Sequence, residues 1–400
     1  MTVDIGDIVE LHLDRPAHGG FSVGRFDGRV VFARYGIPGE QVRAEITEFG
    51  PGGRFLRADV VEVLAASADR REPRCPHARP GECGGCDWQH VDIARQRSIK
   101  AEITREQMIR VGRLDANHPL LVGLTVEPCG DDGDGFNYRT RMDFVADRDG
   151  RLGLRSVRSH EVIRLRDCPL AVDAINNDEA MQTPWLAGGV LRMAAATDGV
   201  AVIPDGATPT TVRQRVFDAG FDVAADGFWQ VHRNAPEAFT ALAREMLEPL
   251  AGDFMLDLYG GVGLFARILG ATLGAGGRVV LVESDSRASR LAKRNLRSLP
   301  QAQVVAERVD RWLRSRSVTH ADLVVLDPPR AGAGKDVMQA ILRMKPRAVL
   351  YVACDPSSLA RDVAFASDAG YELTKLRALD AFPQTQHVET FALFTPAKRD

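Results

Sequence analysis

The sequence has no long apolar run. None of its 400 residues falls in a stretch that reaches the ~18 consecutive apolar residues of a membrane helix. The first residues, MTVDIGDIVE, lack the basic start and apolar core of a secretion signal. We therefore expect a cytoplasmic protein that does not associate with membranes, and we expect it to be a monomer.

The sequence also lacks a strong charge of either sign. It has 51 Lys and Arg against 54 Asp and Glu, so its formal charge is −3 and its pI is about 6.3. Proteins that coat nucleic acid non-specifically are strongly basic. This balance excludes that class and predicts that any RNA or DNA site is a local patch.

Cysteine is scarce, with six in the chain, and three of them cluster in CPHARPGECGGC. In a cytosolic protein such cysteines are more often metal ligands or catalytic groups than disulfide partners. Four thiolates can hold zinc or an iron–sulfur cluster, and spacing alone does not separate these two. The cluster is Cys75-x7-Cys83-x2-Cys86, and Cys168 follows about 80 residues later, which leaves Cys129 as an extra, inert thiol.

Residues 1–64 resemble an all-β protein. Short strand-like runs (IVELHL, RVVFARYG, QVRAEITEF, FLRADVVEVL) alternate with glycine-rich joints, which predicts a small, OB-like barrel. Residues 65–240 read as a mixed α+β domain: a cysteine-rich loop, a helix over 91–114, and a hairpin that turns near residues 149–150. This hairpin is a candidate for contacting RNA phosphates through Arg139, Arg141, Arg148, Arg151, Arg155 and Arg158, although a solvated face is the simpler explanation.

From residue 241 to 400 apolar strands alternate with helices. The strands are FMLDLYG, RVVLVESD, AQVVAE, ADLVVLDPP, AVLYVACDP and ETFALFT. Nearly continuous apolar strands separated by helices indicate a sheet buried on both faces, as in doubly wound, Rossmann-like α/β domains. Ligands bind beyond the carboxyl ends of such strands, so the residues there are the candidates for chemistry.

The first two strands end in a pattern that favours a nucleoside cofactor. Gly260, Gly261 and Gly263 follow the first strand and allow a tight turn close to a ligand. Glu283 ends the second strand about 20 residues later, where a carboxylate can bind both ribose hydroxyls. This pair fits NAD and S-adenosylmethionine equally well, but the loop reads G-G-V-G-L instead of the G-x-G-x-x-G that is typical of dehydrogenases.

The fourth strand narrows the choice between these two cofactors. It ends in Asp327-Pro328-Pro329-Arg330, where two prolines stop the strand and begin a rigid loop. A polar residue followed by Pro-Pro resembles methyltransferases that act on a planar base. Enzymes that methylate amines usually have an aromatic residue after the prolines, so Arg330 disfavours that chemistry.

The next strand ends in Cys354, followed by Asp355 as a helix N-cap and Pro356 in the first helical turn. A thiol at a helix N-terminus is expected to favour its thiolate form. Thiolate addition to carbon 6 of uracil makes carbon 5 nucleophilic enough to take a methyl group, and a base must then remove the carbon 5 proton. Glu389, just before the last strand, is our candidate for that base, and His387 beside it is predicted to be structural.

With these motifs in hand, the whole chain resembles the RNA uracil-C5 (5-methyluridine) methyltransferases. The resemblance rests on DLYGGVG, LDPPR, YVACDPSSLARD and QHVET together. It implies a class I methyltransferase domain that uses S-adenosylmethionine, with Cys354 as nucleophile and Glu389 as proton acceptor. It further implies cofactor contacts at Gln230, Tyr259, Gly261, Glu283 and Asp327.

The resemblance also implies an RNA-binding TRAM domain in the first 64 residues and a [4Fe-4S] cluster on Cys75, Cys83, Cys86 and Cys168, with zinc as the alternative. The expected substrate is transfer RNA or large-subunit ribosomal RNA. The chain departs from the family at Leu264, where relatives often have Asn. Two other functions stay open: a non-catalytic RNA-binding protein on a methyltransferase scaffold, and a methyltransferase for another base.

Overall fold

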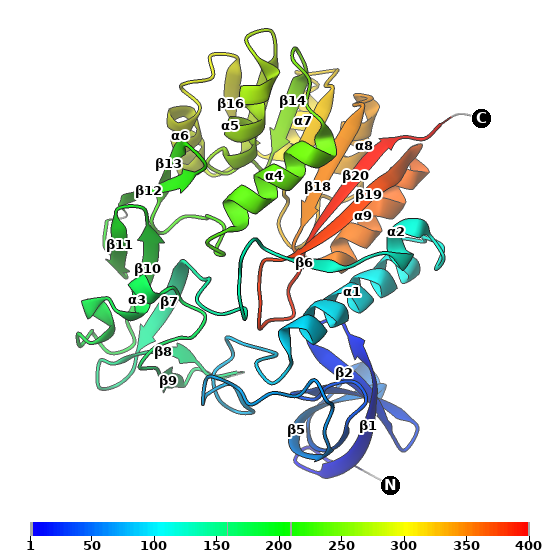
Figure 1. Cartoon of the computed structure of the whole chain (residues 1–400), viewed down its shortest axis with the longest axis vertical. Coiled ribbons are helices and arrows are strands. Elements are labelled where there is room, and N and C mark those ends of the chain that lie inside the picture. The colour runs from blue at the N-terminus through cyan, green and yellow to red at the C-terminus, as the bar shows by residue number, and fades with distance from the viewer. Residues whose placement is uncertain (1–2, 158, 209, 399–400) are drawn as a thin grey trace.

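The computed structural model describes residues 3–157, 159–208 and 210–398, so Arg158 of the predicted arginine strip lies outside the described residues. These residues build a small barrel, a central sheet and a large C-terminal sheet (Figure 1). In the described part of the chain, no helix combines the length and the apolar character that crossing a bilayer requires.

The N-terminal strands close into a barrel, as the sequence predicts. In spatial order they are β1 (Ile8–Ala17), β2 (Phe21–Phe26), β3 (Arg29–Arg34), β5 (Phe55–Ala65) and β4 (Gln41–Phe49). Alternate residues point inward because successive side chains of a strand face opposite sides. Leu11, Leu13, Val31, Ile46 and Leu56 are among the fully buried residues of this core.

Helix α1 (Ile93–Arg110) lies between the barrel and the large sheet (Figure 1). It begins at Asp92, whose side chain accepts a hydrogen bond from the Ala94 backbone N–H, and it packs on β1 and α9 (Pro356–Asp368). The short α2 (Pro119–Val122) follows, and then β6 (Val126–Pro128) pairs in parallel with β19 (Tyr371–Asp380). The segment from α1 to β6, which the sequence places in the central domain, thus packs with the C-terminal sheet.

The central sheet has the order β11 (Gly199–Pro204), β10 (Val190–Ala196), β7 (Arg141–Ala146), β8 (Leu152–Arg155), β9 (Val162–Arg164). Strands β7 and β8 form the hairpin that the sequence predicts. A second hairpin, β12 (Thr211–Val216) and β13 (Ala219–Ala224), and the short α3 (Asp173–Asn176) complete this part.

One member of the arginine strip is not available to RNA. Arg141 is buried, and its Nη1 donates hydrogen bonds to the carbonyls of Ala224, Ala225 and Gly227. Burial lowers its pKa to about 10. The prediction that Arg141 contacts phosphate is therefore wrong, because this side chain holds the loop that leads to Gln230.

The large sheet has eight strands in the order β16 (Ala302–Ala306), β15 (Arg278–Glu283), β14 (Phe254–Leu258), β17 (Leu323–Leu326), β18 (Ala348–Ala353), β20 (Glu389–Pro396), β19, β6. Strands β14 to β18 run parallel, and β20 is antiparallel to β18. The carboxyl ends of the parallel strands therefore meet at one edge.

Helices cover both faces of this sheet. On one face lie α4 (Ala235–Leu247), α5 (Leu264–Gly270) and part of α6 (Ser286–Asn295), and on the other lie α7 (Val309–Ser315), α8 (Lys335–Arg343), α9 and α1. Successive residues of β14 show the alternation: Met255 packs on the first face, and Leu256 on the second. Burial on both sides explains why the sequence shows continuous apolar runs here.

Candidate active site

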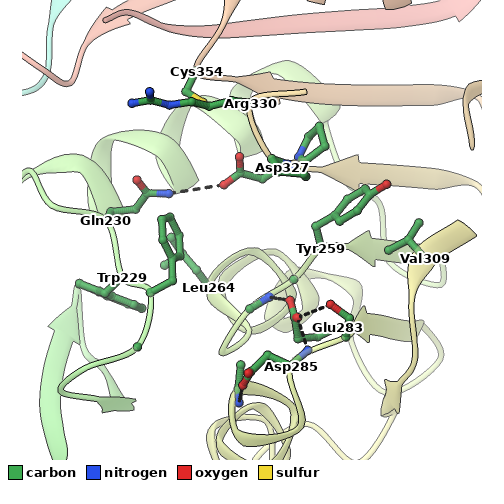
Figure 2. A pocket seen from close by; sticks show the side chains of 18 of the residues that line it. Trp229, Gln230, Tyr259, Leu264, Glu283, Asp285, Val309, Asp327, Arg330 and Cys354 are labelled. Carbon is green, nitrogen blue, oxygen red and sulfur yellow. Dashed lines mark hydrogen bonds between the residues drawn. The ribbon is translucent and has the colours of Figure 1, made fainter. Parts of the chain in front are cut away.

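A large cavity lies at the carboxyl edge of the parallel strands (Figure 2). Its volume is about 1650 Å³, which exceeds the roughly 300–1,000 Å³ of a site for one small ligand. It can therefore hold two ligands side by side. The residues that the sequence singles out for cofactor binding and catalysis all line it, namely Gln230, Tyr259, Gly261, Glu283, Asp327, Cys354 and Glu389.

The turn after β14 forms the floor of the cavity. Tyr259 and Gly261 have left-handed backbone conformations, with φ of 62° and 53°. A Cβ at Gly260 would lie 2.6 Å from a side-chain carbon of Leu281, so no other residue fits there without displacement. The glycines thus let the chain turn sharply between β14 and α5, and their own N–H groups are taken by hydrogen bonds to Val282, Glu283 and Gly260.

Glu283, at the end of β15, fixes this turn. Its carboxylate accepts hydrogen bonds from the backbone N–H groups of Gly261 (3.0 Å) and Asp285 (2.6 Å). Asp285 in turn accepts a hydrogen bond from the Ala288 N–H at the start of α6. Glu283 also accepts a hydrogen bond from the Ser284 hydroxyl at 3.3 Å (Figure 2). A carboxylate has about four lone-pair sites, so acceptor capacity remains for a hydroxyl group of a ligand.

Asp327, at the end of β17, lies in the middle of the cavity. Gln230 Nε2 is 3.4 Å from its Oδ2, which links the central part of the chain to the large sheet (Figure 2). Burial raises the pKa of Asp327 to about 7. This carboxyl group therefore changes charge near neutral pH.

Trp229 and Val309 are among the cavity residues that sequence reasoning missed. Trp229 is buried beside Leu264 in an apolar cluster, and Val309 follows β16 at the carboxyl edge (Figure 2). The sequence does indicate Val309, because it follows the third strand, and residues that follow the other parallel strands are candidates. Trp229 directly precedes Gln230. Leu264, at the start of α5, lines the cavity with an apolar surface.

Cys354 directly follows β18 and is half-buried. Asp355 does act as the N-cap of α9, because its side chain accepts a hydrogen bond from the Ser358 N–H at 2.7 Å. The expectation of a stabilised thiolate is wrong for the protein without ligands. Burial first, and then the charges of Glu389 and Asp327, raise the pKa of Cys354 to about 12, and Arg330 opposes them only in part. The sequence predicts the helix that follows Cys354, but it does not show that Glu389 and Asp327 lie near the thiol.

Glu389 begins β20, the antiparallel neighbour of β18. The register pairs Ala353 with Thr390, so Glu389 lies across from Cys354. Glu389 is 3% exposed, and burial together with the charge of Asp327 raises its pKa well above the ordinary value. A nucleophile candidate and a base candidate thus face one cavity from adjacent strands.

His387 also lines the cavity. Its Nε2 lies 3.3 Å from Arg330 Nη2, and its ring packs edge-on against Phe382. Burial, with the charges of Arg330 and Lys100, lowers its pKa to about 4, so the ring is neutral near pH 7.

The four cysteines of the predicted cluster lie in one region. Gln89 connects two of them: its Nε2 donates to Cys86 Sγ at 3.1 Å, and its Oε1 accepts from the Cys75 N–H. Burial, aided by the charges of Cys168 and Cys75, raises the pKa of Cys83 to about 11. Over residues 3–157, 159–208 and 210–398, however, no three His, Cys, Asp or Glu side chains form a group that could hold a metal ion. The predicted cluster is therefore not confirmed.

Comparisons with known proteins agree with this geometry. The family model for tRNA (uracil-5-)-methyltransferase matches residues 310–396. A protein described as an uncharacterised RNA methyltransferase from Streptomyces avermitilis is 37% identical, covering 99% of this chain and 100% of the relative. Another from Bifidobacterium longum is 36% identical and covers 96% of each.

Among solved structures, the tRNA (uracil-54, C5)-methyltransferase of Pyrococcus abyssi, in complex with S-adenosyl-L-homocysteine, superposes with a TM-score of 0.69. The two sequences are 20% identical, and the match covers 96% of this chain and 99% of the other, so the likeness shows a shared fold over the whole length. From the site, the family match and the full-length relatives, we conclude that the chain is an RNA methyltransferase of the RNA uracil-C5 methyltransferase family.

Proposed function

We propose that the protein transfers a methyl group from S-adenosylmethionine to carbon 5 of a uridine in RNA through a covalent bond between Cys354 and carbon 6. One observation carries the proposal. Cys354 and Glu389 lie across from each other on adjacent strands and line the same cavity as the glycine turn and Asp327. A nucleophile, a base and a nucleoside-binding edge are the parts that this reaction needs.

The residues around the glycine turn fit the cofactor. The turn has no side chain at Gly261, so a ligand can approach its backbone, and Glu283 can accept hydrogen bonds from ribose hydroxyls. Tyr259, Gln230 and Asp327 complete the proposed contacts. When bound, S-adenosylmethionine supplies the sulfonium methyl group that carbon 5 attacks.

Cys354 would open the reaction. The thiol loses its proton to water, the sulfur adds to carbon 6 of uracil, the electron pair of the C5–C6 double bond moves toward the carbonyl oxygen at C4, and carbon 5 becomes nucleophilic. The raised pKa of Cys354 means that the thiol form dominates before the RNA binds. A thiol that stays protonated until the uracil enters the cavity is protected from other reactions.

Glu389 would close the reaction. Once carbon 5 carries the methyl group, its proton is acidic because it is next to a carbonyl group. Glu389 takes this proton, the C–H electron pair re-forms the C5–C6 double bond, and the Cys354 thiolate leaves. The raised pKa of Glu389 makes it a stronger base than an exposed glutamate.

We further propose that the N-terminal barrel contacts RNA, as expected of a TRAM domain. Phe32 packs edge-on against Phe21 and Phe55, at centroid distances of 6.0 and 5.3 Å, and Arg57 lies over both partner rings. All four side chains are partly exposed. Aromatic and arginine planes are typical surfaces for unpaired bases.

The [4Fe-4S] cluster also remains a proposal, with zinc as the alternative. It is supported by four free thiols, three from one loop and Cys168 from a second segment, that lie close enough to influence one another's pKa. Its proposed role is to hold the central loops in place, and iron content and absorbance of the purified protein would test it.

Incubation with methyl-labelled cofactor and separate tRNA and ribosomal RNA fractions tests the proposal. Mass spectrometry of the digested RNA should find labelled 5-methyluridine with the wild type and with Cys129→Ala, a control at a buried cysteine outside the cavity. Cys354→Ala should give none. Labelled 5-methylcytidine would instead identify a methyltransferase for another base, and RNA binding without any label would favour the non-catalytic alternative.

A further inference from the structure

The turn between β1 and β2 of the barrel packs against the active-site loops. Gly20 leaves so little space that a Cβ there would lie 3.3 Å from Gln386 Cβ and 3.5 Å from Asp87 Cγ. Its carbonyl also accepts a hydrogen bond from Trp88 Nε1 at 3.4 Å. Since Gln386 adjoins His387, the barrel reaches the wall of the cavity.

His18, in the same turn, contacts the residue next to the proposed nucleophile. Its Nε2 lies 3.0 Å from Oδ2 of Asp355, while the other oxygen of Asp355 accepts the hydrogen bond from Ser358 N–H that caps α9. Both oxygens of this carboxylate are thereby fixed. His18 and Cys354 also line a second cavity of about 140 Å³, together with Lys100, Arg330 and His387.

We infer that His18 is a positioning residue that couples the barrel to Cys354: in its imidazolium form it fixes and neutralises Asp355 and so makes the thiol easier to ionise. The observation that carries this is the ion pair between two parts of the chain more than three hundred residues apart, formed at the residue that follows Cys354. His18 itself touches no reacting atom.

The surrounding charges show why the pairing matters. The charge of Asp355 raises the pKa of Cys354, as do the charges of Glu389 and Asp327, whereas the charge of Arg330 lowers it. Lys100 is engaged with Asp380, and the neutral His387 adds no charge. Loss of the His18 charge would leave Asp355 uncompensated and make ionisation of the thiol harder.

The pH dependence has a definite sign. The hydrogen bond that His18 donates to Asp355 raises the pKa of His18 above 6.5, although burial opposes it. The ion pair is therefore complete below the ordinary histidine pKa and is lost as pH rises through the raised value. His18 is 40% exposed, so solvent screens part of the effect.

Alkylation of Cys354 by iodoacetamide, followed by mass spectrometry of its peptide, tests the inference without RNA or cofactor. With His18→Gln we expect alkylation near pH 7 to slow by about threefold, which corresponds to a rise of about 0.5 unit in the thiol pKa. The difference should vanish at a pH above the pKa of His18. His18→Gln combined with Asp355→Asn should restore the rate, since the uncompensated charge is gone and asparagine still serves as an N-cap.

The matched control is His12→Gln, because His12 is an exposed histidine on β1 of the same barrel, near Asp14. It should leave the rate unchanged. Equal rates for His18→Gln and the wild type across the pH range would overturn the inference, as would a pH-independent loss that the double variant does not restore. The catalytic consequence, a lower kcat with unchanged KM for the cofactor, rests on the proposed function. If alkylation responds as expected but the wild type methylates no RNA, only the proposed function fails.

Discussion

Replacement of Glu389 by glutamine separates the two halves of the proposed reaction. Glutamine has nearly the same shape but is neutral and cannot accept the carbon 5 proton. Loss of a positioned base costs about 10²- to 10⁴-fold in turnover. The first half should survive, because removing the Glu389 charge lowers the pKa of Cys354. We therefore expect the methylated RNA to stay attached to Glu389→Gln, visible as a protein–RNA band in a denaturing gel.

The same variant makes a prediction about stability. Because burial and Asp327 raise the pKa of Glu389 in the folded protein, the wild type binds more protons folded than unfolded, and its stability falls as pH rises above the ordinary glutamate value of 4.5. Each unit of that elevation costs about 1.4 kcal/mol once the group is ionised. Glu389→Gln should thus be more stable than the wild type at about pH 8, with little difference near pH 4.

Urea denaturation at the two pH values measures this difference. Glu372→Gln, at an exposed glutamate on the neighbouring strand β19, is the control and should change the free energy of unfolding by less than about 0.5 kcal/mol. The reasoning is refuted if Glu389→Gln is no more stable than the wild type at the higher pH, or if it turns over at the wild-type rate.

Three further predictions concern the cofactor site and the cysteines. Calorimetry should show the affinity for S-adenosylmethionine rising several-fold as pH increases through the Asp327 pKa of about 7, and by at most about tenfold per pH unit. S-adenosylhomocysteine lacks the sulfonium charge, so its affinity should show no such rise. Leu264→Asn should lower the free energy of unfolding by about 2–4 kcal/mol in urea, because it places an amide among buried apolar side chains, and Leu264→Met should cost under about 1.5 kcal/mol. Iron bound to the anaerobically purified protein should disappear when serine replaces any one of Cys75, Cys83, Cys86 and Cys168, and equal iron in all variants would contradict the cluster.

Much of the site could be predicted because its residues follow parallel strands. All six apolar runs of the C-terminal half are strands, and residues after the five parallel ones line one cavity because parallel strands end at the same edge. Local patterns suffice for this. The N-cap at Asp355 is likewise a local feature that the sequence already shows.

Features that depend on distant pairing were missed. Strand β6 has three residues and is a strand only because β19 lies beside it, and Arg141 appears as part of a basic strip until its burial is known. The thiolate expectation failed for the same reason. A helix N-terminus is visible in the sequence, whereas the carboxylates that face Cys354 come from two other strand ends. The contact between His18 and Asp355 joins the two ends of the chain and has no local signature at all.

The central claim is the transient bond between Cys354 and a pyrimidine. RNA that contains 5-fluorouridine tests it directly, because fluorine at carbon 5 cannot be removed as a proton and the adduct is trapped after methyl transfer. We predict a stable protein–RNA complex that depends on S-adenosylmethionine, with the methylated nucleotide attached to the Cys354 peptide, and no complex with Cys354→Ala. A trapped adduct on a different residue, or undiminished 5-methyluridine formation by Cys354→Ala, would contradict the account.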